Sequence, residues 1–538
     1  MPPVKIATNL LKQVFSMSAL SFFITSTLGV GLILTTTSRG VYAAGVVGKG
    51  TPGSCTEKAL NKALSGGGKV TFKCGAKPVT IRVTNQKAIS ANTVIDGGNL
   101  ITLSGGGKNR ILSTNNNVKL TLKNLTLANG FANDRGGAIY NSYQSTLAVI
   151  NCKFKNNVSQ KAGEHGGGAI FSFPAAKVIV HKSTFTGNKA SIGGAIWGLN
   201  SDLTVTNSTF IGNKAVDGNM GRGGAIYVDG ANGDNGKIIV RNSTFTKNYA
   251  TSYGGAFFNS LYNNNKTIVE NSTFSGNHVG GGSNGQGGAI WSTGDPTGVY
   301  GIWKYPGNKT TLTVKNTTLS GNTASDQGGG IWLGRHPAGI NITNTTLSNN
   351  TASNSNGGAI TLGDNSKLNI TNSTISGNKV TGAFALGGGI MVASGKANIT
   401  NSTIAGNYAA FQGGGIVGGT KIKLTNTIVA KNKANNGGHN WNIKHNCFDQ
   451  MLNGGNNIQF PAKNPHDSSD YNCTAGIKIA NPLLGPLQNN GGVTKTMGLL
   501  KGSPAINAGN NGACPSKDQR GITRQKSHAC DIGAVEVK

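Results

Sequence analysis

The chain has 538 residues, of which 83 are glycine and only 12% are charged, and its formal net charge is +31 at pH 7. Aliphatic residues are frequent enough to bury a continuous core, so the composition excludes a disordered chain. Because acids are scarce rather than bases dense, the charge indicates either anionic partners or adaptation to acidic surroundings, and no specific nucleic-acid-binding motif is present.

Residues 1–43 have the layout of a secretory signal peptide. Lys5 and Lys12 precede an apolar stretch over 14–34, and Ala43 offers a small-residue cleavage site. An uncleaved anchor is the alternative, since the stretch is about long enough to span a bilayer. No second apolar span follows, so we expect the mature chain to have no membrane span and to be secreted, extracellular or held at the cell surface.

Residues 44–69 are expected to form an N-terminal cap. The segment 55–65 has the pattern of a short amphipathic helix, and the first strand follows at 70–72. A solenoid leaves an unpaired edge at each end, which must be covered.

Two short motifs alternate through residues 70–435 with a repeat of about 30 residues, which is typical of a solenoid. One is Gly-Gly-(Ala/Gly)-(Ile/Phe). The other is an apolar residue followed two or three places later by Asn, as in Phe210-Ile-Gly-Asn213. The first motif begins at Gly136, Gly167, Gly193, Gly223, Gly254, Gly287, Gly328, Gly357, Gly387 and Gly413.

The pattern within each repeat favours strands over helices. Apolar and polar residues alternate over 203–206, and β-branched residues are abundant. We therefore predict an all-β fold, a right-handed single-stranded parallel β-helix in which the equivalents of Ile196, Val205 and Phe210 stack in register. About 12 coils at ~4.8 Å each would give a rod near 55–60 Å long.

Asn-x-Ser/Thr sequences recur at one position of the repeat. They suit N-glycosylation of a secreted eukaryotic protein, but they also suit a ladder of hydrogen-bonded Asn side chains along the rod, which we favour. The clearest copies begin at Asn207, Asn242, Asn271, Asn316, Asn344, Asn372 and Asn401.

Seven successive copies of the Gly-Gly motif are followed by an aromatic residue. If the preceding Ile points inward, alternation along the strand places this aromatic file on the outer face, where it could pack against sugar rings. The alternative is that the file faces inward as core. An insertion over 293–311, with Tyr300, Trp303 and Tyr305, could overhang it. The candidate ligand-binding residues are Tyr140, Phe171, Trp197, Tyr227, Phe257, Trp291 and Trp332.

No catalytic residue, metal site or cofactor site is predicted. Glycoside hydrolysis needs paired carboxyls and calcium needs several oxygen ligands, yet no repeat position collects the 18 acids on adjacent coils. The adjacent residues Glu164 and His165 would point to opposite faces of a strand. The acids with a structural explanation are Asp96, Asp229, Asp234, Asp467 and Asp470.

Six of the seven cysteines form pairs that are local in sequence, which fits an oxidising compartment. The expected disulfides join 55 to 74, 447 to 473 and 514 to 530. Cys152 occupies the repeat position of Ser208 and is expected to be a buried free thiol. From about residue 436 the repeat decays, so 436–538 is expected to be a loop-rich C-terminal cap.

The repeats resemble those of polymorphic outer-membrane-protein β-helices. The C-terminal motifs resemble bacterial choice-of-anchor Q proteins. These motifs are Asn481-Pro-Leu-Leu-Gly-Pro-Leu-Gln-Asn-Asn-Gly-Gly-Val493, Gly502-Ser-Pro-Ala-Ile-Asn-Ala-Gly509 and Cys530-Asp-Ile-Gly-Ala-Val-Glu536. Asn507 departs from that pattern, which usually has Asp there. The resemblance implies a pectate-lyase-like fold and an extracellular or cell-surface location.

The function indicated by the sequence is a non-catalytic adhesin or polysaccharide-binding surface protein, with a polysaccharide or an anionic surface polymer as its partner. The alternative is a polysaccharide lyase or glycoside hydrolase of the same fold. Binding without turnover would favour the first, and release of unsaturated or reducing sugar ends would favour the second.

Overall fold

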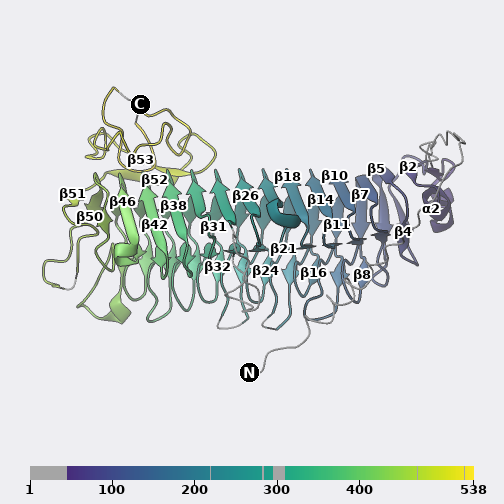
Figure 1. Ribbon diagram of the computed structural model, residues 1–538, viewed down its shortest axis with the longest axis horizontal. Helices are drawn as coiled ribbons and strands as arrows, with labels where there is room; N and C mark the ends of the chain where they lie inside the picture. The colour runs from purple at the N-terminus through teal and green to yellow at the C-terminus, as the bar shows by residue number, and fades with distance from the viewer. Residues whose placement is uncertain are drawn as a thin grey trace, which may run out of the picture. The chain divides into compact units, whose positions relative to one another are not determined.

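The computed structural model describes residues 45–218, 220–281, 284–294, 309–468, 470–525 and 527–537. The signal peptide predicted over 1–43 lies outside these residues, and so do Tyr300, Trp303 and Tyr305 of the insertion. The described chain is a parallel β-helix, as predicted, and Figure 1 shows its coils side by side. Within these residues no helix is long and apolar enough to cross a membrane.

One coil consists of four short strands. In a central coil these are β18 (Asp202–Thr206), β19 (Thr209–Ile211), β20 (Lys214–Ala215) and β21 (Ile226–Asp229). The chain bends between β18 and β19 at Asn207, which has a left-handed φ of 50°. Asn tolerates this conformation better than most residues, because its short polar side chain can bond locally. A longer loop joins β20 to β21.

Each strand pairs in parallel with its equivalents in the coils before and after it. β18 and β19 belong to a 28-stranded sheet, which we call sheet A, and β20 belongs to an 11-stranded sheet, sheet C. Sheet A continues past both ends of the others, so the rod has more than the expected 12 or so coils.

β21 belongs to the third, 12-stranded sheet, which we call sheet B. Its other members are β4 (Lys87–Ile89), β6 (Leu112–Thr114), β9 (Ile139–Asn141), β13 (Ile170–Ser172), β17 (Ile196–Leu199), β25 (Phe257–Ser260), β29 (Ile290–Thr293), β33 (Ile331–Leu333), β37 (Ile360–Leu362), β41 (Ile390–Val392) and β45 (Ile416–Val417).

The core is built from residues stacked coil upon coil, as predicted. Ile196, Val205 and Phe210 are fully buried and pair in register with their equivalents in the next coil. The Phe210 ring lies parallel to those of Phe185 and Phe245, with centroids 4.7 Å apart in each case.

The Gly-Gly motif makes the close bend before the ten strands of sheet B from β9 onward. Gly223 has a φ of 64°, and a Cβ on it would lie 2.2 Å from the Ile226 carbonyl oxygen. A Cβ on Gly224 would lie 2.1 Å from the Gly255 carbonyl oxygen of the next coil. Both distances are below van der Waals contact, so neither position accepts a side chain.

The continuous asparagine ladder lies at a different repeat position from the one expected. It is formed by the buried Asn that follows each stacked apolar residue, such as Asn213, whose Nδ2 donates to Asn248 Oδ1 at 3.0 Å. At the Asn-x-Ser/Thr position such bonds occur only between some coils, for example from Asn344 to Asn316 at 3.1 Å. There the side chains point outward and reach water in several coils.

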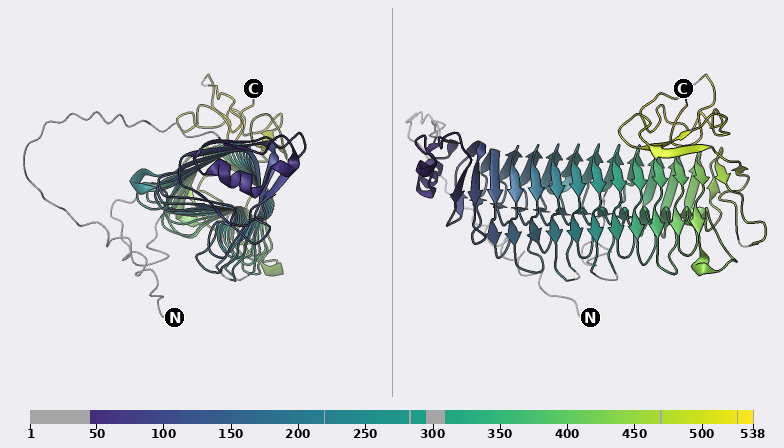
Figure 2. Two further views of the ribbon diagram at one scale, coloured as in Figure 1. Left: turned by 90° about the vertical axis from the view of Figure 1, so that its right-hand side faces the viewer. Right: turned by 180° about the vertical axis from the view of Figure 1, so that it is seen from behind.

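The N-terminal cap contains the helix α2 (Glu57–Leu64), which buries Leu60 and Ala63 and is joined to the first coil by the Cys55–Cys74 disulfide. Seen from that end, α2 lies across the cross-section of the coils (Figure 2). The following strand, β2 (Gly68–Phe72), starts close to the predicted 70–72.

The C-terminal region has two parts with different positions. Residues 436–480 extend sheet A by β49 (Leu452–Asn453), β50 (Ile458–Phe460) and β51 (Lys478–Ile479) and contain the Cys447–Cys473 disulfide. Residues 481–537, with the hairpin β52 (Leu484–Gln488) and β53 (Thr496–Leu499), fold back over the flank of sheet A (Figures 1 and 2).

Residues 481–537, which we call the flank segment, cover outward residues of the sheet A strands that follow the Asn bend, the equivalents of β19. Thr346 donates to the Lys495 carbonyl at 2.5 Å, and Thr374 donates to Gln519 at 2.7 Å. The sequence predicted that residues 436–538 form a cap over the end of the rod. The flank segment instead packs along the side of the last coils, where the small side chains of the rod leave room for it.

The disulfide prediction agrees with the structure. The three pairs are joined, and Cys152 is a buried free thiol whose backbone amide donates to Ser183 Oγ at 3.0 Å. Its repeat position is therefore the one occupied by Ser, as inferred. Burial raises the pKa of the Cys152 thiol to about 11, which keeps it unreactive.

Candidate functional site

The aromatic file lies on the outer face of sheet B. Its side chains form a cluster of their own, separate from the core cluster that contains Ile196 and Ile226. The alternative of an inward-facing stack is therefore wrong. The expectation of an exposed stripe is also wrong, because Trp197 and Trp291 are only 2% and 5% exposed.

One residue of the predicted file needs correction. Phe257 pairs with Ile226 and Ile290 and is fully buried in the core, whereas Phe258 pairs with Tyr227 and Trp291. In this coil Phe replaces the Ile of the Gly-Gly motif, so two aromatic residues are adjacent and the outward one is the second. Phe258 therefore belongs to the file in place of Phe257.

The first three rings of the file are covered by arginine. Arg110 lies over the ring of Tyr140 at 5.2 Å, and Arg135 lies over Phe171 and Trp197 at 5.1 and 4.9 Å. These rings are tilted against one another by more than 50°. Cation–π contacts of this kind occupy the ring faces that a ligand would need.

The last four rings form one continuous stack, which we call the aromatic floor. Tyr227, Phe258, Trp291 and Trp332 lie nearly parallel, with successive centroids 4.6, 4.4 and 4.9 Å apart and interplanar angles of at most 12°. A cavity of about 240 Å³ lies over them. We call this cavity the central groove.

Polar residues from two directions line the central groove. On one side are Arg222, Tyr253 and Gln286, each one residue before a Gly-Gly motif and linked by parallel bridges from coil to coil. On the other side are Asp229 and Ser260, which pair in register at the ends of β21 and β25.

Two contacts fix the groove's polar groups. Gln286 accepts a hydrogen bond from Trp291 Nε1 at 3.1 Å, so its amide group is oriented by the floor. The Arg222 guanidinium lies 5.6 Å from the Tyr253 ring and 5.8 Å from the Phe258 ring. The groove thus has an apolar floor made by the edges of stacked rings, with preorganised polar rims, and small-ligand sites commonly combine apolar walls with a few placed polar groups.

Asp229 is the one carboxylate among the described residues that line the groove. Tyr262, from the turn after β25, donates a short hydrogen bond to its Oδ1. Burial raises the pKa of Asp229, which the Tyr262 hydrogen bond partly opposes, and burial together with Asp229 raises the pKa of Tyr262. The prediction that Asp229 has only a structural role is incomplete, because Asp229 ends a strand of sheet B and lines the cavity.

Three of the other acids considered from the sequence, Asp96, Asp467 and Asp470, have local structural partners. Asp96 Oδ1 accepts from the Gly98 amide at 3.1 Å and from Asn124 Nδ2 at 2.9 Å. Asp467 and Asp470 accept backbone amides in the C-terminal loops. Among the residues that the structure describes, no three His, Cys, Asp or Glu side chains are grouped to hold a metal ion.

Sequence reasoning missed the groove's rim residues. Arg222, Tyr253 and Gln286 each stand five residues before a ring of the floor, and that constant spacing is visible in the sequence. Their chemical types differ from coil to coil, however, and a search for a repeated residue type passes over them.

The repeat is of a known kind. The model of the Chlamydia polymorphic membrane protein repeat matches residues 182–199, 207–229 and 316–334. The coils of this β-helix are polymorphic membrane protein-like repeats. The second match starts at the bend residue Asn207 and ends at Asp229, so it spans the Asn ladder, the Gly-Gly bend and the first ring of the groove floor.

Two curated proteins are similar over part of the chain. The probable autotransporter YfaL of Escherichia coli strain K12 is 31% identical over 175 residues, which are 30% of this chain and 14% of that protein. The metabotropic glutamate receptor-like protein R of Dictyostelium discoideum is 33% identical over 142 residues, 26% of this chain and 8% of that protein. The matches thus span a small part of each relative's length.

Among solved structures, the tailspike protein of E. coli bacteriophage HK620 in complex with a pentasaccharide is similar at 13% identity, with a TM-score of 0.30 over 77% of this chain and 76% of that one. A mutant of the same tailspike has a TM-score of 0.29 over 72% of this chain and 66% of that one. Similarity at this level carries no argument about ligand or activity.

Proposed function

We propose that this protein is a secreted or cell-surface β-helix that binds polysaccharide in the central groove and does not cleave it. The observation that carries the proposal is the cavity of about 240 Å³ that lies over four stacked aromatic rings between polar rims. The ring edges give the C–H groups of a sugar an apolar surface to contact, while Arg222, Asp229 and Gln286 line the same cavity with donors and acceptors for hydroxyl groups.

The similarity of the repeats and the net charge support an adhesive surface protein. Membrane-protein repeats and an autotransporter-like stretch are consistent with display at a cell surface, and residues 1–43 have the layout of an export signal. We infer that the C-terminal motifs are a choice-of-anchor Q region. With a net charge of +31, an acidic polysaccharide or another anionic surface polymer is the favoured ligand class.

The test is a panel of neutral and anionic polysaccharides, scored for both binding and cleavage. Affinity electrophoresis would measure binding, and assays for reducing and unsaturated sugar ends would measure turnover. We expect at least one member to be retained, with no new ends. The absence of binding to every member would reject the proposal.

Two variants locate the binding site. Trp332→Ala removes one end of the aromatic floor and should weaken binding about tenfold, which corresponds to a loss of roughly 1.4 kcal/mol of binding free energy. Trp197→Ala is the matched control, since Trp197 belongs to the same file but is covered by Arg135. It should lower stability and leave binding intact. Equal loss of binding in both variants would place the ligand elsewhere.

A polysaccharide lyase or hydrolase is the second candidate, and Asp229 is the observation that favours it. A carboxyl whose pKa is raised in a groove is suited to general acid–base catalysis. If the wild type releases sugar ends, Asp229→Asn should abolish the release and retain binding. Release that survives this substitution would exclude Asp229 as the catalytic residue.

A further inference from the structure

Three aromatic residues project from consecutive loops near the C-terminal end of the rod. Phe384 is 81% exposed and Trp441 is 63% exposed, whereas Phe411 lies half-buried with its ring centroid 5.8 Å from that of Phe384. Exposed apolar side chains gathered in this way mark a binding surface more often than scattered ones do. We call these three residues the aromatic ledge.

Backbone hydrogen bonds between neighbouring loops hold the aromatic ledge in place. The Phe411 amide donates to the Ala385 carbonyl at 3.3 Å, and the Asn436 amide donates to the Phe411 carbonyl at 2.7 Å. Asn436 Nδ2 in turn donates to the Trp441 carbonyl. Coil-to-coil hydrogen bonds therefore fix the spacing of the three loops.

The ledge continues one side of the central groove. The rim residues stand immediately before the Gly-Gly motifs, and so do Leu386 and Gln412, which bridge each other in parallel. Phe384 and Phe411 lie two and one residues before these two positions. At ~4.8 Å per coil, the ledge begins about 10 Å along the rod from Trp332.

The charge around the ledge suits the ligand class proposed for the groove. The three loops, residues 381–386, 410–412 and 435–442, contain no acid, and a carboxylate contact follows directly after the third loop, where Asp467 accepts from the Ile443 amide. Exposed lysines stand at the starts of the strands before the first and third loops, at Lys379 and Lys433.

We propose that the aromatic ledge is a second subsite for the same polysaccharide, which binds further sugar rings of a chain that leaves the groove past Trp332. The inference rests on the proposed function of the groove. A linear anionic polymer fits this placement because the two aromatic surfaces lie along one edge of the rod, separated by a single coil that has Thr361 at the ring position. Two linked subsites raise the affinity for long chains above that for short ones.

The test uses size-fractionated oligomers of polygalacturonate, alginate and hyaluronate, with affinities measured by calorimetry. Wild type should bind long oligomers at least tenfold more tightly than oligomers that fill only the groove. The double substitution Phe384→Ala and Trp441→Ala should remove that gain and leave the affinity for short oligomers unchanged. Tyr143→Ala, another exposed aromatic far from both subsites in sequence, is the control and should change neither.

The outcomes separate the two proposals. A double variant that keeps the wild-type gain with chain length overturns the ledge proposal while the groove stands. The ledge proposal is also overturned if the double substitution abolishes binding to anionic lipid vesicles, or changes the oligomeric state measured as mass in solution, while the gain with chain length remains. If no oligomer of any length binds the wild type, both proposals fail.

Discussion

Glu57 connects the N-terminal helix to the first coils. Its carboxylate accepts hydrogen bonds from the Thr84 amide and hydroxyl at 2.8 and 2.6 Å and lies 2.5 Å from Lys87 Nζ. Burial would raise the pKa of Glu57, but the bonds from Lys87 and Thr84 outweigh it and lower the pKa to about 2.

This pKa shift predicts how pH acts on the cap. A carboxyl with a depressed folded pKa stabilises the fold above its unfolded pKa of ~4.3, and the contribution is lost as pH falls towards 2. Glu57→Gln should therefore lower the melting temperature at pH 7, and the difference from wild type should shrink steadily below pH 4. A difference that is independent of pH would contradict the assigned contacts.

Adjacent residues in one coil show where sequence reasoning was sufficient and where it was not. The inward or outward direction of the aromatic file followed from strand alternation, which is a local property. Assigning Phe257 rather than Phe258 to the file failed because Phe stands where other coils have Ile, so only the pairing register separates core from groove.

At the scale of single elements, the buried Asn ladder joins neighbouring coils. Asn248 accepts from the Asn213 amide and side chain at 3.0 Å each, and its Nδ2 donates to the Phe210 carbonyl and to Asn277 Oδ1 at 3.0 and 2.9 Å. All of these groups are buried, so no water can replace a lost partner.

Asn248→Ala should therefore be strongly destabilising. Each buried polar group left without a partner costs about 1–3 kcal/mol, and several are affected. Urea unfolding followed by circular dichroism should show a clear fall in the midpoint. Thr244→Ala, in the same coil but facing outward, is the control and should change the midpoint little. Similar midpoints for the two variants would mean that the ladder adds no stability.

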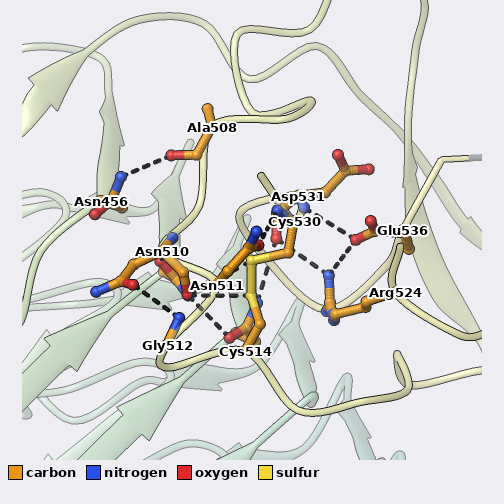
Figure 3. The surroundings of a disulfide bond; sticks show 12 residues. Asn456, Ala508, Asn510, Asn511, Gly512, Cys514, Arg524, Cys530, Asp531 and Glu536 are labelled. Carbon is orange, nitrogen blue, oxygen red and sulfur yellow. Dashed lines mark hydrogen bonds and ion pairs between the residues drawn. A yellow bond between two sulfur atoms is a disulfide. The ribbon is translucent and has the colours of Figure 1, made fainter. Parts of the chain in front are cut away.

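The flank segment depends on a buried ion pair. Arg524 Nη1 donates to Glu536 Oε2 at 2.6 Å, both side chains are at most 3% exposed, and Arg524 Nη2 also reaches Asn372 of the rod at 3.2 Å. Figure 3 shows this pair beside the Cys514–Cys530 disulfide, with Asp531 next to it.

Removing one partner leaves a buried charge unpaired, which costs about 3–5 kcal/mol. Glu536→Gln should therefore loosen residues 481–537 from the rod, and limited proteolysis should cleave this segment faster while the coils stay intact. Asp234→Asn, at an exposed acid, serves as the control. Unchanged cleavage of the segment in Glu536→Gln would show that other contacts hold it.

For the whole molecule, the sequence predicted the features that repeat. The β-helix, the in-register core, the three disulfides and the terminal helix followed from periodicity, patterning and local pairing. The ladder was expected at the Asn-x-Ser/Thr position because that motif is conspicuous, although the Asn that follows each stacked apolar residue is the one that is buried in coil after coil.

The features that do not repeat could not be predicted in this way. The groove lies only over the last four rings, because Arg110 and Arg135 lie over the first three, and the flank segment is placed by contacts between residues more than a hundred positions apart. Such contacts depend on single side chains in three dimensions, and the repeat pattern contains no information about them.

The central claim is that sugar rings bind in the central groove, over the aromatic floor. A crystal structure with an oligosaccharide from the panel tests it most directly. We predict a sugar ring packed on the rings of Trp291 and Trp332, with hydroxyl groups bonded to Arg222, Asp229 or Gln286. A bound oligosaccharide on another face of the rod, with the central groove empty, would contradict it.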